Sequence, residues 1–356
     1  MASRLTLKLR ELAPGIALCV LLTVLAFLLQ GLEKWLVGEA YLEALVLAIL
    51  LGVVVRTLWT PTPTCNPGID FSAKSLLEFA VVLLGASISA ATVFALGPAM
   101  LVGIACVVSL AIASSYLICR GLGLPQKISI LIACGNSICG NSAIAAVAPI
   151  IGADGDDVAC SIAFTAVLGV VVVLGLPLLV PILNLSLEQY GVLAGLTVYA
   201  VPQVLAATLP IGALSNQVGT VVKLVRVLML GPVVLGLSLI AGKFAAAPAP
   251  AAPSEGAVDA PPKAARPELH ELVPWFIIGF LVVAAVRSLG LIPELLLAPL
   301  KSTAAILTTV SMAALGLGVD VRVVAKAGMR VATAVTASLI VLGVISFILI
   351  RLVHVP

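Results

Sequence analysis

Two Gly-Asn-Ser triplets, five residues apart, form the most unusual polar feature of this sequence. Both lie within a long apolar stretch, in the run Ala133–Ile144. Glycine is unfavourable inside a helix, and asparagine and serine compete for backbone hydrogen bonds. The run therefore predicts a broken helix, whose unpaired N–H groups and positive dipole end suit an anion. The alternative is close helix packing, which explains one triplet better than two. The candidate binding residues are Asn136, Ser137, Gly140, Asn141 and Ser142.

Two basic residues, Lys223 and Arg226, lie inside another apolar stretch, at 217–242. Because they are three residues apart, they share one face of a helix. A charge at such a depth costs roughly 2.5–3.5 kcal/mol on insertion scales, so it needs a reason. One interpretation is that both side chains extend to the membrane surface. The other, favoured because no carboxylate is nearby in the sequence, is a cationic, water-accessible pocket for an anion.

Two further polar residues are candidates within apolar stretches. Gln203 follows Pro202, which removes a backbone donor and kinks a helix, so Gln203 either lies beside a break or simply faces the bundle. Glu78 begins the stretch at 76–96 and is the only carboxylate for which a buried position is plausible. It either carries a coupled proton or extends to the surface. No aspartate is central in any apolar stretch, which argues against a sodium–proton antiporter.

Other kinds of chemistry are not indicated. The two histidines, His270 and His354, lie at the edges of apolar stretches, so a Ser-His-Asp arrangement inside the membrane is excluded. The sequence has no Walker or HExxH motif, no CxxC pair among its seven cysteines, and no basic patch interleaved with aromatic residues. We therefore expect no enzyme activity, no metal, no cofactor and no nucleic-acid binding. Transport would be driven by a gradient rather than by ATP.

The composition requires that membrane helices position these residues. Of the 356 residues, 62% are hydrophobic and 10% are charged, whereas a soluble domain has about 25% charged residues. A span needs about 20 apolar residues, and in lipid it must be a helix to satisfy its own backbone. The expected fold class is all-α, a polytopic membrane protein of ten or eleven helices. Eleven stretches qualify, at 12–30, 40–58, 76–96, 98–119, 128–152, 158–183, 190–213, 217–242, 272–289, 296–318 and 329–350.

The placement of lysine and arginine orients these spans. With the N-terminus in the cytoplasm, thirteen of the nineteen basic residues fall on the cytoplasmic side and four fall outside. The remaining two are Lys223 and Arg226. We therefore expect a multi-pass protein of the bacterial inner membrane with a cytoplasmic N-terminus. The acidic loop Asp154–Asp157 then falls outside.

One long connection and two weak repeats organise the chain. Residues 244–268 are rich in Ala and Pro, which predicts a disordered cytoplasmic linker. It separates a membrane region at 1–243, with eight spans and the candidate site, from one at 269–356 with three spans. Leu84–Gly97 is similar to Leu315–Gly328, and Ala145–Ile150 is similar to Ala206–Ile211. These matches predict an inverted repeat, although chance could produce either in a chain so rich in Ala, Leu and Gly.

Taken together, several segments resemble the sulfate exporter family of bacterial inner-membrane transporters. The resemblance implies about ten helices, an inverted-repeat fold like that of bile-acid and arsenite transporters, and export of a sulfur oxyanion. It also implies candidate site positions at Asn141, Ser142, Gln203, Lys223 and Arg226. The linker is longer than the family leads us to expect. The matching segments, in order, are LLGASIS, ICGNSAIAAVAPII, VPQVLAA, VVKLVRVLMLGP and AALGLGVDVRVVAKAG.

We therefore expect a secondary transporter that exports sulfate or sulfite. The asparagines and serines of the two triplets, with the amides of the broken helix, would bind the oxygen atoms, and Lys223 and Arg226 would supply charge. The expected partners are this small anion and the lipid bilayer, and a homodimer is one arrangement that we allow for. The main rival is a transporter of a carboxylate or sulfonate on the same fold. A membrane protein without transport activity is the lesser rival.

Overall fold

The computed structural model describes residues 2–37, 43–87, 97–240, 275–319, 328–353 and 355. Within those residues the regular elements are helices and there is no strand, as the composition predicts. By length and composition, six helical stretches there could cross a membrane: Glu11–Leu36, Gly97–Gly121, Gly155–Leu183, Ala213–Leu239, Glu294–Leu317 and Met329–Leu352. The predicted count of eleven crossings is therefore not confirmed.

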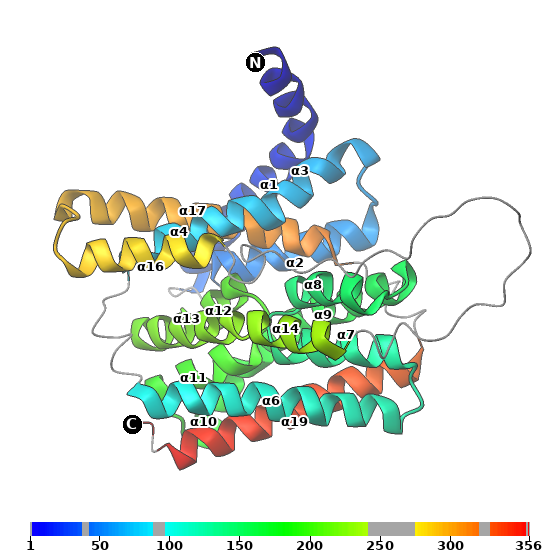
Figure 1. Cartoon of the computed structure of the whole chain (residues 1–356). Helices are drawn as coiled ribbons and strands as arrows, with labels where there is room; N and C mark the ends of the chain where they lie inside the picture. The colour runs from blue at the N-terminus through cyan, green and yellow to red at the C-terminus, as the bar shows by residue number, and fades with distance from the viewer. Residues whose placement is uncertain are drawn as a thin grey trace, which may run out of the picture.

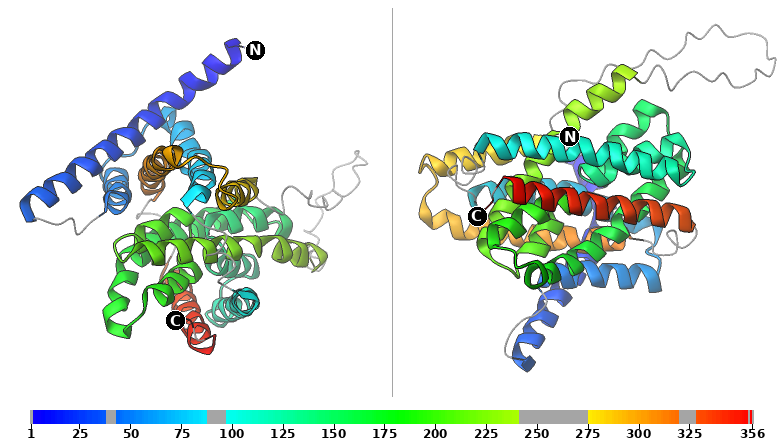
Figure 2. Two further views of the ribbon diagram at one scale, coloured as in Figure 1. Left: turned by 90° about the vertical axis from the view of Figure 1, so that its left-hand side faces the viewer. Right: turned by 90° about the horizontal axis from the view of Figure 1, so that it is seen from below.

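The helices form two groups, which Figures 1 and 2 show as separate layers. The first group, uppermost in Figure 1, contains α1 (Ala2–Val37), α2 (Ala44–Leu58), α3 (Asn66–Phe71), α4 (Leu77–Leu84), α16 (Trp275–Ser288) and α17 (Glu294–Leu317). The second group contains α6 (Gly97–Gly121), α7 (Gln126–Ser137), α8 (Asn141–Ile151), α9 (Gly155–Gly175), α10 (Leu179–Leu183), α11 (Leu187–Thr197), α12 (Val201–Thr208), α13 (Ala213–Leu228), α14 (Leu230–Ile240) and α19 (Met329–Leu352).

Glycines hold the helices of each group in close contact. In the first group, a Cβ on Gly52 of α2 would lie 2.5 Å from the carbonyl oxygen of Ala313 in α17. In the second, a Cβ on Gly195 of α11 would lie 2.6 Å from the carbonyl oxygen of Gly219 in α13. Without a side chain at these positions the two backbones touch, which is how membrane helices gain packing energy where lipid gives no hydrophobic drive.

The predicted span at 128–152 is not a single crossing. It consists of α7 and α8, two helices of 12 and 11 residues. At 1.5 Å per residue each is only about 16–18 Å long, roughly half of the hydrocarbon core. The Lys127 ammonium, at the start of α7, donates to the carbonyl oxygen of Gly152, just after α8, at 2.6 Å. The chain therefore enters through α7, turns, and returns through α8; we call residues 126–152 hairpin 1.

The predicted span at 190–213 folds in the same way. It consists of α11 and α12, of 11 and 8 residues. The hydroxyl of Tyr190, near the start of α11, donates to the carbonyl oxygen of Ala207, near the end of α12, at 2.7 Å. The two ends of this segment are therefore close together, and we call residues 187–208 hairpin 2.

The 29-residue helical stretch Gly155–Leu183 lies between the two hairpins and is long and apolar enough to cross a membrane, so we expect the hairpins to enter from opposite faces. This corrects the expected position of the acidic loop. Asp154–Asp157 follows hairpin 1 directly and so lies on the same face as Lys127, not on the opposite one. The lysine and arginine count could not detect this, since no basic residue occurs between 128 and 222. Each hairpin replaces one predicted crossing, so two crossings are removed in total. The predicted orientation of the helices after hairpin 2 is therefore unaltered.

Some predictions concern residues that the structure does not describe. The linker at 244–268 is one, and parts of the first repeat, at 88–96 and 320–327, are others. In the described parts of that repeat, α4 packs against α17, and the helices that follow, α6 and α19, pack against each other. The inverted repeat is not confirmed by this pairing alone.

Candidate functional site

The first break lies where the Gly-Asn-Ser triplets predict it, between Ser137 and Asn141. Ile138 leaves the helical conformation with φ −119° and ψ −83°, and Gly140 has φ +67°. A Cβ on Gly140 would also lie 3.1 Å from the Cβ of Tyr199, in hairpin 2. Residues with a side chain rarely adopt this positive φ, and such a sparsely populated backbone conformation costs them about 1–3 kcal/mol. Glycine is therefore needed here both for the turn and for the close approach of the other hairpin.

The second break lies at Val198–Ala200, between α11 and α12. Pro202 does not kink a continuous helix, as one interpretation had it, but stands in the first turn of α12, where a missing N–H costs nothing. The carboxamide oxygen of Gln203 accepts from the N–H of Ala200 at 3.2 Å and so helps to begin the helix. Gln203 is 5% exposed and packs against Gly169 of α9, where a Cβ would lie 2.5 Å from its Nε2.

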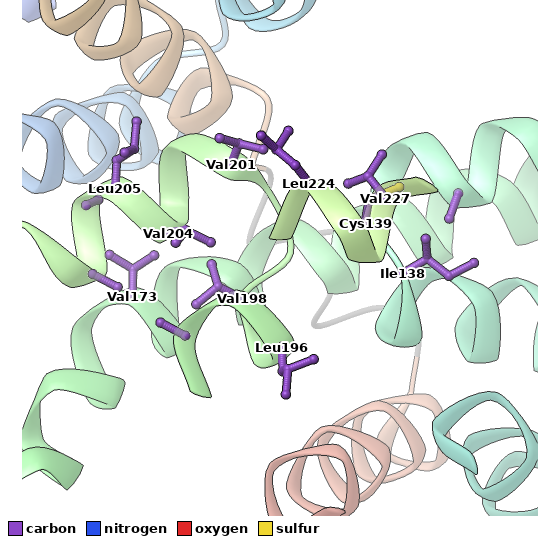
Figure 3. Packing of buried hydrophobic residues seen from close by; sticks show 14 of the residues in the cluster. Ile138, Cys139, Val173, Leu196, Val198, Val201, Val204, Leu205, Leu224 and Val227 are labelled. Atoms are coloured by element: carbon purple, nitrogen blue, oxygen red, sulfur yellow. The ribbon is translucent and has the colours of Figure 1, made fainter. Parts of the chain in front are cut away.

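The two breaks meet inside the second group. The Tyr199 hydroxyl donates to Oδ1 of Asn136 at 2.8 Å, which joins hairpin 2 to hairpin 1. Asn136 in turn donates from Nδ2 to the carbonyl oxygen of Val335 in α19, at 3.1 Å. Figure 3 shows apolar side chains of both breaks, among them Ile138 and Val198, around Leu224 and Val227 of α13. The meeting point is thus enclosed by apolar packing.

Lys223 and Arg226 reach this meeting point from α13, and both are 0% exposed. The interpretation that they extend to the membrane surface is therefore wrong. Both donate to backbone carbonyl groups of the two breaks. Within the described residues, neither is paired with a carboxylate. Two basic side chains are thus buried beside the ends of four half-helices.

The side of the break formed by α8 offers groups that could contact a solute. The N–H groups of Ala143 and Ile144 donate to the carbonyl oxygen of Gly140, at 3.1 and 3.2 Å. Those of Asn141 and Ser142 are left without an intrahelical acceptor. The Asn141 carboxamide oxygen accepts from the hydroxyl of Thr165 in α9 at 2.7 Å, which orients the side chain, and Ser142 is exposed.

Ser137 is the remaining candidate in hairpin 1. It is 1% exposed, and its hydroxyl has no hydrogen-bond partner among the described residues. The structure thus brings seven sequence-predicted residues to the two breaks and their immediate neighbourhood, together with the glycine that makes the first turn: Asn136, Ser137, Gly140, Asn141, Ser142, Gln203, Lys223 and Arg226.

Glu78 does not join this cluster. It lies in α4 of the first group, where it accepts from the indole N–H of Trp275, in α16, at 2.8 Å. The neighbouring Phe79 packs edge-on against the same indole, with 5.2 Å between ring centroids. In the part of the chain that the structure covers, no three His, Cys, Asp or Glu side chains gather as metal ligands would.

Sequence reasoning missed Tyr199 and Thr165, which hold two of the predicted asparagines in place. Tyr199 could have been singled out from the sequence. Tyrosine is rare in this chain, with four in total, and Tyr199 lies immediately before the predicted break at Ala200-Val201-Pro202. Thr165 carried none, because a threonine in a membrane helix usually bonds to its own backbone, as Thr165 also does to Ser161.

Comparison with known proteins places the chain in a family. A family model described as "Conserved hypothetical protein 698" matches residues 14–335. A UPF0324 membrane protein of Brucella melitensis biotype 1 is 56% identical over 348 residues, which cover 98% of this chain and 93% of that protein. One of Bradyrhizobium diazoefficiens is 56% identical over 347 residues, covering 98% and 94%. One of Bacillus cereus is 34% identical over 339 residues, covering 94% and 90%.

These relatives are named only as membrane proteins, so sulfate export stays a prediction. No solved structure matches the chain. Apolar helices long enough to span a bilayer and extensive identity to named membrane proteins agree with each other. The chain is a multi-pass membrane protein that belongs to the UPF0324 family.

Proposed function

We propose that this protein is a secondary transporter that exports a small inorganic oxyanion, sulfate or sulfite, across the bacterial inner membrane. One observation carries the proposal: two hairpins, separated in the chain by a helical stretch long enough to cross a membrane, meet beside two fully buried basic side chains. A site at such a meeting point is separated from each face by only one half-helix. Small movements at the hairpins could therefore open it to one face at a time, as alternating access requires.

The chemistry of the meeting point favours an anion. Each break contributes one helix N-terminus and one C-terminus, whose partial charges of about +0.5 and −0.5 offset each other. In this proposal Lys223 and Arg226 supply the positive charge, and neither is paired with a carboxylate among the described residues. The N–H groups of Asn141 and Ser142, with their side chains, supply donors to oxyanion oxygens. Asn136, Ser137 and Gln203 complete the proposed site.

The arrangement of the hairpins also supports an inverted repeat as part of this proposal. Each hairpin is followed by one long helical stretch, Gly155–Leu183 after hairpin 1 and Ala213–Leu239 after hairpin 2. The two similar segments Ala145–Ile150 and Ala206–Ile211 begin in the second helix of each hairpin. Because the two units enter from opposite faces, they have the relation that inverted-topology repeats show in many secondary transporters.

An organic anion is the second candidate, and a cavity favours it. A cavity of about 300 Å³ begins one turn before Asn136. Its lining is almost wholly apolar, and a half-open apolar pocket of this kind would fit the hydrocarbon part of a carboxylate or sulfonate. The residues that line it are Ile112, Ala113, Tyr116, Gln126, Ile130, Ala133, Cys134, Val233 and Leu237.

The deciding experiment is radiolabelled sulfate and sulfite flux in proteoliposomes, with and without a pH gradient. We expect flux well above that of empty liposomes, competed by inorganic oxyanions more strongly than by acetate, methanesulfonate or taurine. The reverse order of competition would favour the organic anion. Absence of flux for every anion in the panel would overturn the proposal.

The same assay tests the site. The double variant Asn141→Ala, Ser142→Ala removes two side-chain donors, and a hydrogen bond to a charged group contributes roughly 1.5–3 kcal/mol. We expect at least a tenfold loss of sulfate flux at low substrate concentration. Ser109→Ala is the matched control, because Ser109 is exposed on α6 and bonds only to its own helix, at Ala105. Equal flux in the double variant and the control would remove these residues from the site.

A further inference from the structure

Each broken helix leaves carbonyl groups that its own backbone cannot satisfy. The turn at Ile138–Gly140 ends α7, and the turn at Val198–Ala200 ends α11. The last carbonyl groups of a helix have no intrahelical donor. Buried in a membrane protein, each unsatisfied group costs several kcal/mol. Both breaks therefore need donors from elsewhere in the protein.

Lys223 supplies donors to both breaks at once. Its ammonium donates to the carbonyl oxygen of Ile138, in hairpin 1, at 2.7 Å. It also donates to the carbonyl oxygen of Val198, in hairpin 2, at 2.8 Å. One side chain thus joins two turns that enter from opposite faces of the membrane.

Arg226 repeats this connection one turn further along α13. Its Nε donates to the carbonyl oxygen of Ser137 at 2.8 Å, and an Nη donates to that of Asn136, both in hairpin 1. The other Nη donates to Val198 in hairpin 2 at 3.2 Å. Cations at helix C-termini are also favoured by the helix dipole. The bonds of both residues are thus explained by the two breaks without any solute.

We infer that Lys223 and Arg226 are positioning residues rather than ligands of the transported anion. They fasten the turns of the two hairpins to each other, and the Tyr199–Asn136 hydrogen bond is a third fastening. The two turns therefore behave as one unit, and loosening one loosens the other. A positioning role rests on the proposed function, since it assumes that a solute binds at these turns. The link between the two turns does not depend on the proposed function.

A native cysteine reports on the state of the first turn. Cys139 lies in the turn of hairpin 1 and is 8% exposed, so it should react slowly with a membrane-permeant maleimide. A cysteine at Ala200, in the turn of hairpin 2, would report on the other. Each reporter is placed in a background in which all other cysteines are replaced by serine or alanine. The full-length protein is assayed in membrane vesicles.

Lys223→Gln and Arg226→Gln test the fastening. We expect each to increase the alkylation rate at least tenfold at both reporters, while Lys223→Arg and Arg226→Lys recover most of the protection. Lys301→Gln is the control, because Lys301 is exposed on α17 of the first group. If Lys223→Gln does not accumulate, Tyr199→Phe removes only the third fastening and should raise both rates about threefold. Unchanged rates, or a change at one reporter alone, would overturn the inference.

Sulfate transport kinetics separate positioning from direct binding. If the residues position the turns, the glutamine variants should lose kcat while KM changes less than threefold, and the conservative variants should regain kcat. A tenfold rise in KM with kcat retained would make them ligands and overturn the inference. If the wild type transports no anion, the proposed function fails, and the alkylation rates still decide whether the turns are fastened together.

Discussion

At the scale of single residues, several polar groups of the two breaks bond to the protein itself. Asn136 is held by Tyr199 and Val335, and Gln203 bonds to the backbone of Ala200. Residue type alone predicts that each could contact a solute, because an amide or ammonium bonds equally well to protein or ligand. Only the fold shows which of these groups already have protein partners.

Replacement of Gly140 tests the turn of hairpin 1. In Gly140→Ala the new Cβ meets a left-handed backbone conformation and lies about as close to Tyr199 as contacts allow. We expect the free energy of unfolding to fall by about 1–3 kcal/mol. Thermal unfolding in detergent measures it. Gly31→Ala is the control, because Gly31 is helical with nothing near its Cβ position, so alanine should be neutral or stabilising there. Equal stability of both variants would contradict this account of the turn.

At the scale of elements, the half-helices depend on contacts with neighbouring helices for their stability. A helix of 8 to 12 residues cannot cross the bilayer, so α7, α8, α11 and α12 are stable only because neighbouring helices enclose them. The hydrogen bonds named here between helices, such as Asn136 to Val335 and Trp275 to Glu78, each join two helices of one group. The same holds for the glycine contacts of α2 with α17 and of α11 with α13.

The contact of α2 with α17 offers a test at this scale. In Gly52→Ala the added methyl would overlap the backbone of α17 at Ala313 and Gly316, so the helices must move apart. Overpacking of this kind costs typically about 1–3 kcal/mol. We expect a lower midpoint of thermal unfolding than in the wild type. Gly343→Ala, in α19, should not lower it, because nothing lies within 4 Å of that Cβ position. A Gly52→Ala protein as stable as the control would show that this contact is not close.

At the scale of the whole molecule, the hairpins decide which face of the membrane each connection occupies. Because hairpin 1 returns to the face from which it entered, the residues before α7 and after α8 share one face. The connection between α10 and α11 lies on the other, since Gly155–Leu183 crosses in between. The two hairpins together remove an even number of crossings, so the proposed cytoplasmic N-terminus remains compatible with the distribution of basic residues.

Labelling with a membrane-impermeant maleimide tests this topology. In a background without native cysteines, Gln126→Cys and Asp156→Cys should react from the same side of the membrane, and Leu187→Cys from the opposite side; all three positions are exposed. Oriented vesicles of both orientations provide the comparison. Reaction of Gln126→Cys and Asp156→Cys from opposite sides would mean that residues 126–156 cross the membrane once and that hairpin 1 does not exist.

Residue types and hydropathy are enough to predict the lipid environment, the all-helical class of fold and the region of the candidate site. Hydrophobicity and the scarcity of charge require membrane helices, since lipid cannot satisfy a backbone, and the two Gly-Asn-Ser triplets locate the first break. The sequence could not show that two predicted spans turn back, because an apolar run of 25 residues has the same composition whether it crosses or returns. The basic residues that orient spans are absent from that whole region.

The partners of the polar residues depend on how the helices pack and cannot be predicted from the sequence. Lys223 and Arg226 are 85 to 90 residues away from the carbonyl groups of hairpin 1 to which they donate. Their spacing predicts a shared helix face, but what that face meets depends on how α13 packs against two hairpins from opposite sides. A backbone carbonyl group left by a broken helix is invisible in the sequence, since every residue carries one. Such a carbonyl group is free to accept a hydrogen bond from a side chain only where the helix is interrupted.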